Sequence, residues 1–243
     1  MVLQVFWYAT LTALATGLGA LPFAFFKNFS KRWLGFANAI AAGLMLAASF
    51  SLIYEGIPLS APRTLIGVLV GLVFILLSHR WIEAKGGINW GQMTQVDAKK
   101  ALMIVLVMTA HSFAEGVGVG VSFGAGEAFG TFISLAIAVH NIPEGLAISL
   151  VLVPRGVSWV KAALWSIFSS LPQPLMAVPA YLFVEVFKPF LPFGLGFAAG
   201  AMIWLVFSEI LTDALEDTPS EVVASTVTLA IVAMLAFQLY IAP

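Results

Sequence analysis

Residues 101–153 read ALMIVLVMTAHSFAEGVGVGVSFGAGEAFGTFISLAIAVHNIPEGLAISLVLV, and they contain two apolar runs, each long enough to cross a bilayer as a helix. The runs cover about residues 100–124 and 129–153, with a turn centred near Glu127. Each carries a similar polar pattern, HSFAEG from His111 and HNIPEG from His140. A His and a Glu four residues apart lie on one face of a helix. The stretch therefore predicts two antiparallel membrane helices, each presenting one imidazole and one carboxylate.

The rest of the chain has the same membrane character. Of its 243 residues, 61% are hydrophobic and 9% charged, and the mean hydropathy is +1.02, which excludes a water-soluble globule. A net charge of −1 without a basic stripe argues against nucleic acid as a partner. We predict an all-α polytopic membrane protein with a single transmembrane domain, residues 1–243. Its eight expected helices cover about residues 3–26, 33–57, 62–82, 100–124, 129–153, 160–186, 191–214 and 221–241.

The distribution of basic residues predicts the orientation, because Lys and Arg near helix ends are retained on the cytoplasmic side. One side of the predicted bundle holds only Arg63 and Lys188. Both termini are therefore expected outside the cytoplasm or in an equivalent lumen; which membrane hosts the protein is left open. The other nine basic residues lie on the opposite side: Lys27, Lys31, Arg32, Arg80, Lys85, Lys99, Lys100, Arg155 and Lys161.

The two His/Glu pairs are the residues that hydrocarbon should exclude. In antiparallel neighbours with a turn near Glu127, His111 lies at about the depth of Glu144, and Glu115 at about that of His140. An ionised carboxylate at that depth costs ~2.5–3.5 kcal/mol, and every Lys and Arg lies at or beyond a predicted helix end. A divalent cation would supply the missing charge, and a mixed imidazole and carboxylate shell suits a first-row transition metal. With no Cys in the chain, a thiolate site is excluded.

Two further patterns favour transport. Pro143 cannot donate to the carbonyl of Val139, which predicts an opened backbone within a turn of the site, as in discontinuous transporter helices. Residues 41–53, AAGLMLAASFSLI, resemble residues 198–210, AAGAMIWLVFSEI, although the two helices are expected to run in opposite directions. Together with the repeated His/Glu pattern, this indicates an inverted repeat whose pseudo-twofold axis passes between the helices at 100–124 and 129–153.

These motifs resemble the ZIP family of divalent metal transporters, particularly its short prokaryotic-type branch: H-N-x-P-E-G, a preceding H-S-x-x-E-G and a following AAGAMIWLVFSE. The resemblance covers almost the whole chain. It implies eight helices arranged as three, two and three, extracytoplasmic termini, and transport of zinc or a related metal toward the cytoplasm. It also implies a primary metal site and an acidic residue close to the transport path, Glu209. The site residues would be His111, Glu115, His140 and Glu144.

The sequence departs from the family pattern at the positions where some members hold a second metal. The matching positions are Ser112, Asn141 and Gln173, none of which carries a charge. A second cation would gain no further countercharge, so one tightly bound ion is expected. Ala114 replaces a Pro that many relatives have, which puts local unwinding of that helix in doubt. The connection at residues 83–100 contains no His, so it gives no support for metal sensing there.

An intramembrane metalloenzyme is the alternative, since the same four residues could activate a metal-bound water. The chain contains no H-E-x-x-H motif, and four protein ligands would fill a tetrahedral zinc. We therefore expect a transporter with no covalent chemistry and no cofactor, and the metal as its cargo. Membrane lipid is an expected partner. The sequence leaves open the choice among zinc, iron, manganese, cadmium and cobalt, with zinc preferred, and the oligomeric state, a homodimer included.

Overall fold

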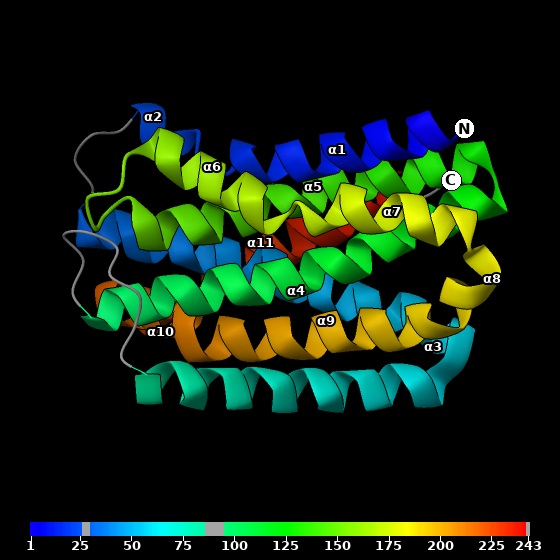
Figure 1. The fold of residues 1–243 in the computed structure, drawn as a ribbon. Coiled ribbons are helices and arrows are strands. Elements are labelled where there is room, and N and C mark those ends of the chain that lie inside the picture. Colours follow the sequence, from blue (N-terminus) through cyan, green and yellow to red (C-terminus); the bar gives the residue numbers. More distant parts are fainter. Residues whose placement is uncertain (26–29, 86–94, 242–243) are drawn as a thin grey trace.

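A computed structural model of the chain describes residues 1–25, 30–85 and 95–241, and throughout that part the regular elements are helices lying along one common direction (Figure 1). Six of these helices are long and apolar enough to cross a membrane. The elements in chain order are α1 (Val2–Leu18), α2 (Pro22–Phe25), α3 (Lys31–Lys85), α4 (Gln95–Ala125), α5 (Glu127–Leu152), α6 (Trp159–Ser169), α7 (Pro172–Leu182), α8 (Val184–Phe187), the 3₁₀ turn η1 (Lys188–Phe190), α9 (Leu191–Leu205), the π-helical segment η2 (Val206–Ile210), α10 (Leu211–Asp217) and α11 (Ser220–Ile241).

Prolines and glycines explain where the helices bend and end. Within α3, Ser60 has φ −171° and ψ 97°, which is extended backbone, and it lies between Pro58 and Pro62. Because proline cannot donate the hydrogen bond that continues a helix, the chain folds back there (Figure 1). Gly126 has φ +152°, a conformation that residues with a Cβ rarely adopt, and it makes the turn between α4 and α5.

Several predicted spans differ from the observed helices. The predicted span 3–26 is divided between α1 and α2, and the predicted span 160–186 is divided between α6 and α7, where Pro172 begins the second helix. The span 191–214 contains the π-helical η2. α4 begins at Gln95, about a turn earlier than predicted. Residues 86–94 of the predicted connection, like Lys27, lie outside the described residues.

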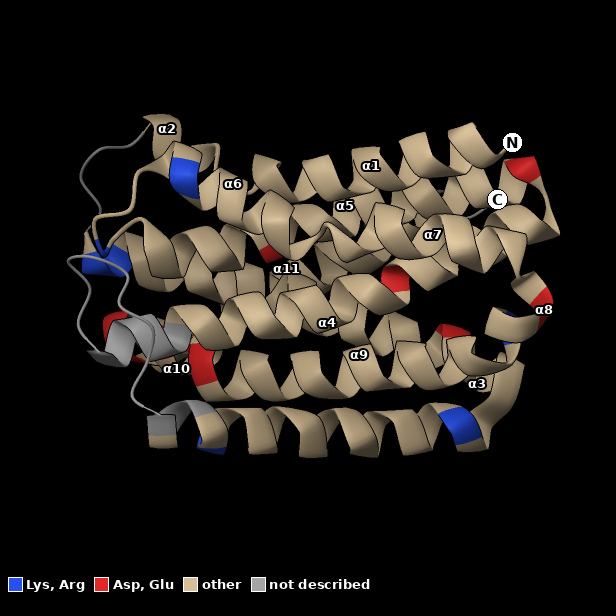
Figure 2. Ribbon diagram, in the orientation of Figure 1, with Lys and Arg blue, Asp and Glu red and all other residues tan. Residues whose placement is uncertain are grey.

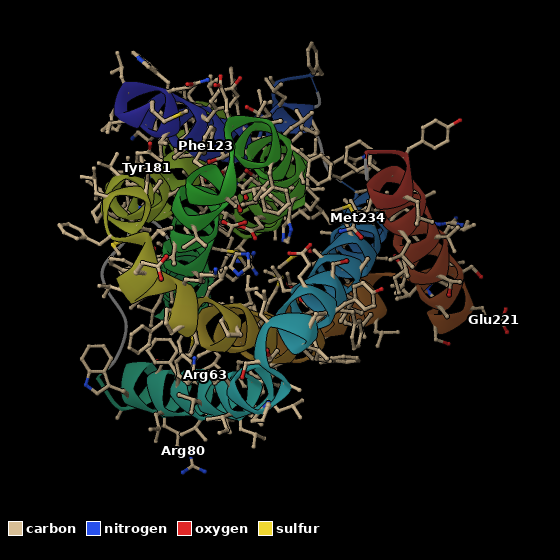
Figure 3. All side chains as sticks on the ribbon, turned by 90° about the vertical axis from the view of Figure 1, so that its right-hand side faces the viewer. Arg63, Arg80, Phe123, Tyr181, Glu221 and Met234 are labelled. Carbon is tan, nitrogen blue, oxygen red and sulfur yellow. The ribbon has the colours of Figure 1, made fainter. Side chains whose placement is uncertain are left out.

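α4 and α5 lie at the centre of the bundle. α5 packs against α1 and α6 on one side and against α3 on the other, while α4 packs against α7 and α9. Viewed along the bundle, α1 and α7 lie on one side of this pair, and α3 and α11 on the other (Figure 3). The exposed Arg80 projects away from the bundle at its edge (Figure 3). Any group on the facing sides of α4 and α5 is therefore surrounded by protein.

Candidate metal centre

The central pair of helices brings the four predicted ligands together. His111 and Glu115 come from α4, and His140 and Glu144 come from α5. Their side chains are buried, with exposed fractions of 1%, 3%, 7% and 0%. Each offers one ligand atom such that all four atoms lie within 4.8 Å of one another. This juxtaposition follows from the i, i+4 spacing on two antiparallel helices.

The shortest distance within the group crosses between the two helices at the predicted depth. His111 Nε2 lies 2.9 Å from Glu144 Oε1 and 3.5 Å from Glu115 Oε1. His140 Nε2 lies 3.4 Å from the same Glu144 oxygen. The two imidazole rings have centroids 5.5 Å apart and are tilted by 35°. Glu144 Oε1 therefore lies between two imidazole nitrogens, and the expected pairing in depth of His111 with Glu144 is confirmed.

In the described part of the chain, several buried polar atoms of these four residues have no hydrogen-bond partner outside the group. They are His111 Nδ1 and Nε2, His140 Nε2, Glu115 Oε1, and Glu144 Oε1 and Oε2. Buried polar atoms are rarely left in this condition, because each loses its interaction with water without replacement. A divalent cation within reach of two imidazole nitrogens and carboxylate oxygens would satisfy these atoms.

The distribution of charged residues also favours a divalent cation at this centre. The Lys and Arg residues of the described part lie at the two ends of the bundle, and none lies in its middle (Figure 2). Two buried carboxylates therefore have no fixed cation beside them. Together with two neutral imidazoles and one divalent cation they would form a neutral N₂O₂ assembly. That this group binds metal stays a prediction.

A hydrogen-bonded network occupies the positions where a second metal was considered. Gln173, from α7, donates from Nε2 to Glu115 Oε2 at 2.5 Å. Its Oε1 accepts from Asn141 Nδ2 at 3.1 Å and from Thr12 Oγ1 at 2.6 Å. Ser112 Oγ lies 3.5 Å from Ser170 Oγ, at the break between α6 and α7. The three uncharged positions are thus all buried beside the centre and hydrogen-bonded.

Sequence reasoning missed Thr12 and Thr16. Thr16 Oγ1 lies 2.7 Å from Ser170 Oγ, and the backbone oxygen of Thr12 accepts from Asn141 Nδ2 at 2.8 Å. Both threonines are buried on α1. Their i, i+4 spacing in an apolar helix was a visible signal of a polar face, but nothing in the spacing indicated which helix that face would meet.

Two predictions about the surroundings have different outcomes. The expected opening of the backbone at Pro143 is wrong: α5 continues as one helix through this residue, with the lost donor confined to a single position. α4 is also continuous through Ala114, in keeping with the doubt about unwinding. Glu209 lies on η2, is partly exposed, and stands outside the four-residue group.

Comparison with known proteins gives a consistent answer. A family model described as ZIP zinc transporter matches residues 89–239. The chain is 32% identical over 224 residues to the zinc transporter GufA of Myxococcus xanthus, covering 84% of this chain and 85% of that protein. It is 32% identical over 219 residues to the zinc transporter ZIPB of Bordetella bronchiseptica, covering 82% of this chain and 69% of that protein.

A longer plant relative is also similar. An Arabidopsis thaliana protein named as a zinc transporter is 49% identical over 225 residues, which cover 91% of this chain. The match spans only 36% of that protein, so the chain corresponds to about a third of its length. The family model, GufA and the plant protein all match across the segment that holds α4 and α5.

Proposed function

The chain belongs to the ZIP zinc transporter family, and we propose that it carries Zn²⁺ across a membrane toward the cytoplasm through the centre formed by His111, Glu115, His140 and Glu144. The observation that carries this proposal is the group of four buried ligand atoms within 4.8 Å of one another, in the middle of a membrane-spanning bundle. The metal is the cargo, and Fe²⁺, Mn²⁺ and Cd²⁺ are alternatives that the same ligands accept.

Eight membrane crossings fit the structure when α3 counts as two, the other five long helices as one each, and α6 and α7 together as one. α3 has 55 residues, which would extend about 80 Å as one straight helix, more than twice the hydrocarbon thickness. Its fold-back at Ser60 therefore supports two crossings. α6 and α7 contain 11 residues each, too few for a crossing alone but enough when joined end to end. The result is one domain over residues 1–243, arranged as three, two and three helices, with α4 and α5 as the central pair.

The proposed orientation places both termini outside the cytoplasm or in a lumen. α1 begins and α11 ends at the same end of the bundle (Figure 1). The first turns of α3 and α6 and the connection before α6 lie at the opposite end, and they carry the basic residues Lys31, Arg32, Arg155 and Lys161. By the positive-inside rule this opposite end is cytoplasmic.

Membrane lipid is proposed to surround the bundle. Large apolar side chains are more than half exposed on several helices, and an apolar surface of this kind is stable against hydrocarbon rather than water. Examples are Leu69, Leu164, Leu175 and Leu229.

We assign a pathway role to Glu209. This residue follows the buried helix α9 and lies on the π-helical η2, where the extra residue per turn disturbs the regular backbone bonding. π-helical turns occur frequently at functional sites. A carboxylate on such a turn, before α10 at the cytoplasmic end, would receive a cation that leaves the centre.

The family is one of transporters, and the named relatives are zinc transporters, so the metalloenzyme alternative has no support. Purified protein in liposomes with an encapsulated fluorescent zinc chelator tests the proposal. External zinc should produce a signal that His140→Ala greatly reduces. His79→Ala is the matched control, since this histidine packs against Trp204 and lies outside the four-residue group. Equal uptake by wild type and His140→Ala at limiting zinc would contradict the assignment.

A further inference from the structure

Gln173 restricts how Glu115 can face the centre. The Gln173 amide is fully buried, and it donates to Oε2 of Glu115. The other carboxylate oxygen, Oε1, makes no hydrogen bond and lies 3.5 Å from His111 Nε2. In the described part of the chain, both oxygens of Glu144, in contrast, have no hydrogen-bond donor from outside the four-residue group. The two carboxylates therefore differ: Glu115 presents one oxygen to the centre, and Glu144 has two available.

The orientation of the Gln173 amide is itself determined by neighbours on two other helices. Its Oε1 accepts from Thr12 on α1 and from Asn141 on α5, so both lone pairs of this oxygen are used. If the amide turned over, its oxygen would face the Glu115 carboxylate and its NH₂ group would face the NH₂ group of Asn141. Asn141, with the Thr12 hydroxyl as a second donor, thus keeps the NH₂ group directed at Glu115.

We propose that Gln173 is a positioning residue that holds Glu115 as a one-oxygen ligand and thereby favours Zn²⁺ over larger divalent cations such as Cd²⁺. This inference rests on the proposed function of the four-residue centre. Zinc in proteins is almost always bound by four ligands in a tetrahedron. Larger cations accept more ligand atoms, including both oxygens of one carboxylate. A donor that occupies Glu115 Oε2 keeps the number of available ligand atoms low.

The hydrogen bond from Gln173 to Glu115 can be removed with little loss of the other hydrogen bonds in this network. In Gln173→Leu, Asn141 Nδ2 can still donate its hydrogen bond to the backbone oxygen of Thr12, which is 2.8 Å away. Thr12 Oγ1 can likewise still donate to the backbone oxygen of Ala9, which is 2.7 Å away. The main loss is therefore the donor to Glu115 Oε2. Thr12→Val is a milder second variant, because it removes one of the two donors that orient the amide and preserves the shape of the side chain.

Gln238 offers a matched control. It is also a glutamine in a contact between helices, partly buried near the end of α11, and its Oε1 accepts from Ser51 Oγ at 2.7 Å. After Gln238→Leu, Ser51 Oγ can still donate a hydrogen bond to the backbone oxygen of Ala47, which is 3.0 Å away. This variant therefore removes the same kind of side chain and a hydrogen bond between α11 and α3, outside the four-residue group.

The experiment measures Zn²⁺ and Cd²⁺ affinity of each full-length purified variant by competition with a chelator. Gln173→Leu should weaken zinc binding by about 10–100-fold, the usual effect of losing a partner that orients a ligand. Cadmium binding should weaken less, so the zinc-to-cadmium affinity ratio falls. Thr12→Val should lower the ratio in the same direction by a smaller factor, and Gln238→Leu should leave it unchanged.

An equal loss for both metals, or no loss for either, would overturn the proposal, because a merely structural role would not change the ratio. If Gln173→Leu does not fold, an unchanged ratio in Thr12→Val would overturn it equally. His140→Ala separates this outcome from failure of the centre itself. Wild-type affinity for both metals in His140→Ala would contradict the proposed function, whereas lost binding there with an unchanged ratio in Gln173→Leu would contradict only the role of Gln173.

Discussion

At the glycine that follows Glu144, the backbone of α1 leaves no room for a side chain on α5, and adding one methyl group there tests how the centre is supported. A Cβ on Gly145 would lie 1.7 Å from the backbone oxygen of Thr16. Ordinary van der Waals contact begins at 3.4 Å, so one helix must move by about 1.7 Å relative to the other. Neither helix can yield locally, because the atom that is met belongs to the backbone. We therefore expect Gly145→Ala to separate α1 from α5.

The separation has two consequences that can be given magnitudes. Overpacking of this kind costs about 1–3 kcal/mol, and contact with backbone places it toward the upper value. The hydrogen bond from Asn141 to the backbone oxygen of Thr12 is 2.8 Å long and spans the same two helices one turn away, so a shift of this size would break it. Such bonds in membrane proteins contribute about 0.6 kcal/mol. The expected destabilisation is about 2–4 kcal/mol.

The assay is thermal unfolding of the purified protein, combined with zinc uptake in liposomes. For a chain of this size the loss corresponds to a fall in Tm on the order of 10 °C. Gly118→Ala is the control: Gly118 is also buried in the central pair, but an added Cβ would meet only a Leu191 side-chain carbon at 3.9 Å. If Gly145→Ala were as stable as Gly118→Ala, the close approach of α1 would not support the centre.

Three other predictions concern the metal. Glu144→Ala should nearly abolish zinc binding and leave the protein inserted, because both Glu144 oxygens lack other partners; tight binding by this variant in equilibrium titration would refute the ligand set. Metal analysis of the wild type should give about one tightly held ion per chain, and two ions of similar affinity would show that the uncharged positions Ser112, Asn141 and Gln173 do not exclude a second. Apparent zinc affinity should fall on acidification from about pH 6.5, the ordinary pKa of His, because protons compete for the same atoms. Calorimetry in buffers of different ionisation enthalpy measures the proton release, and an enthalpy independent of buffer near that pH would contradict the competition.

The meeting of the four ligands could be predicted because it depends on local geometry. An i, i+4 spacing fixes which side chains share a face, and a short turn fixes that the two helices are antiparallel neighbours at matched depth. His111 and Glu144 illustrate this, since they are 33 positions apart in the chain and their side chains approach to 2.9 Å. Nothing beyond the sequence of two adjacent helices was needed.

The surroundings of the centre could not be predicted in the same way, because they depend on contacts between segments far apart in the chain. Thr12 and Gln173 are 161 residues apart, and no spacing rule relates α1 to α7. The hydropathy pattern also did not reveal where helices are interrupted. The break at Ser170 and Leu171 and the π turn at Glu209 both lie within continuous apolar runs. At Pro143 the local rule was misleading, since neighbouring helices hold α5 in one piece around it.

Without metal, the negative charge of the two buried carboxylates must be offset in some other way for the folded protein to be stable. Two carboxylates lie in a buried cluster with no Lys or Arg in the middle of the described bundle, and Gln173 can offer Glu115 a neutral donor but no charge. Without metal, the remaining negative charge can be offset only by protons held among the same four side chains. A divalent cation that binds must then displace them, because imidazole and carboxylate ligate in their deprotonated forms. Metal transfer through the proposed centre would consequently be linked to proton transfer by the composition of the site itself, and that linkage would not require a basic residue in the path.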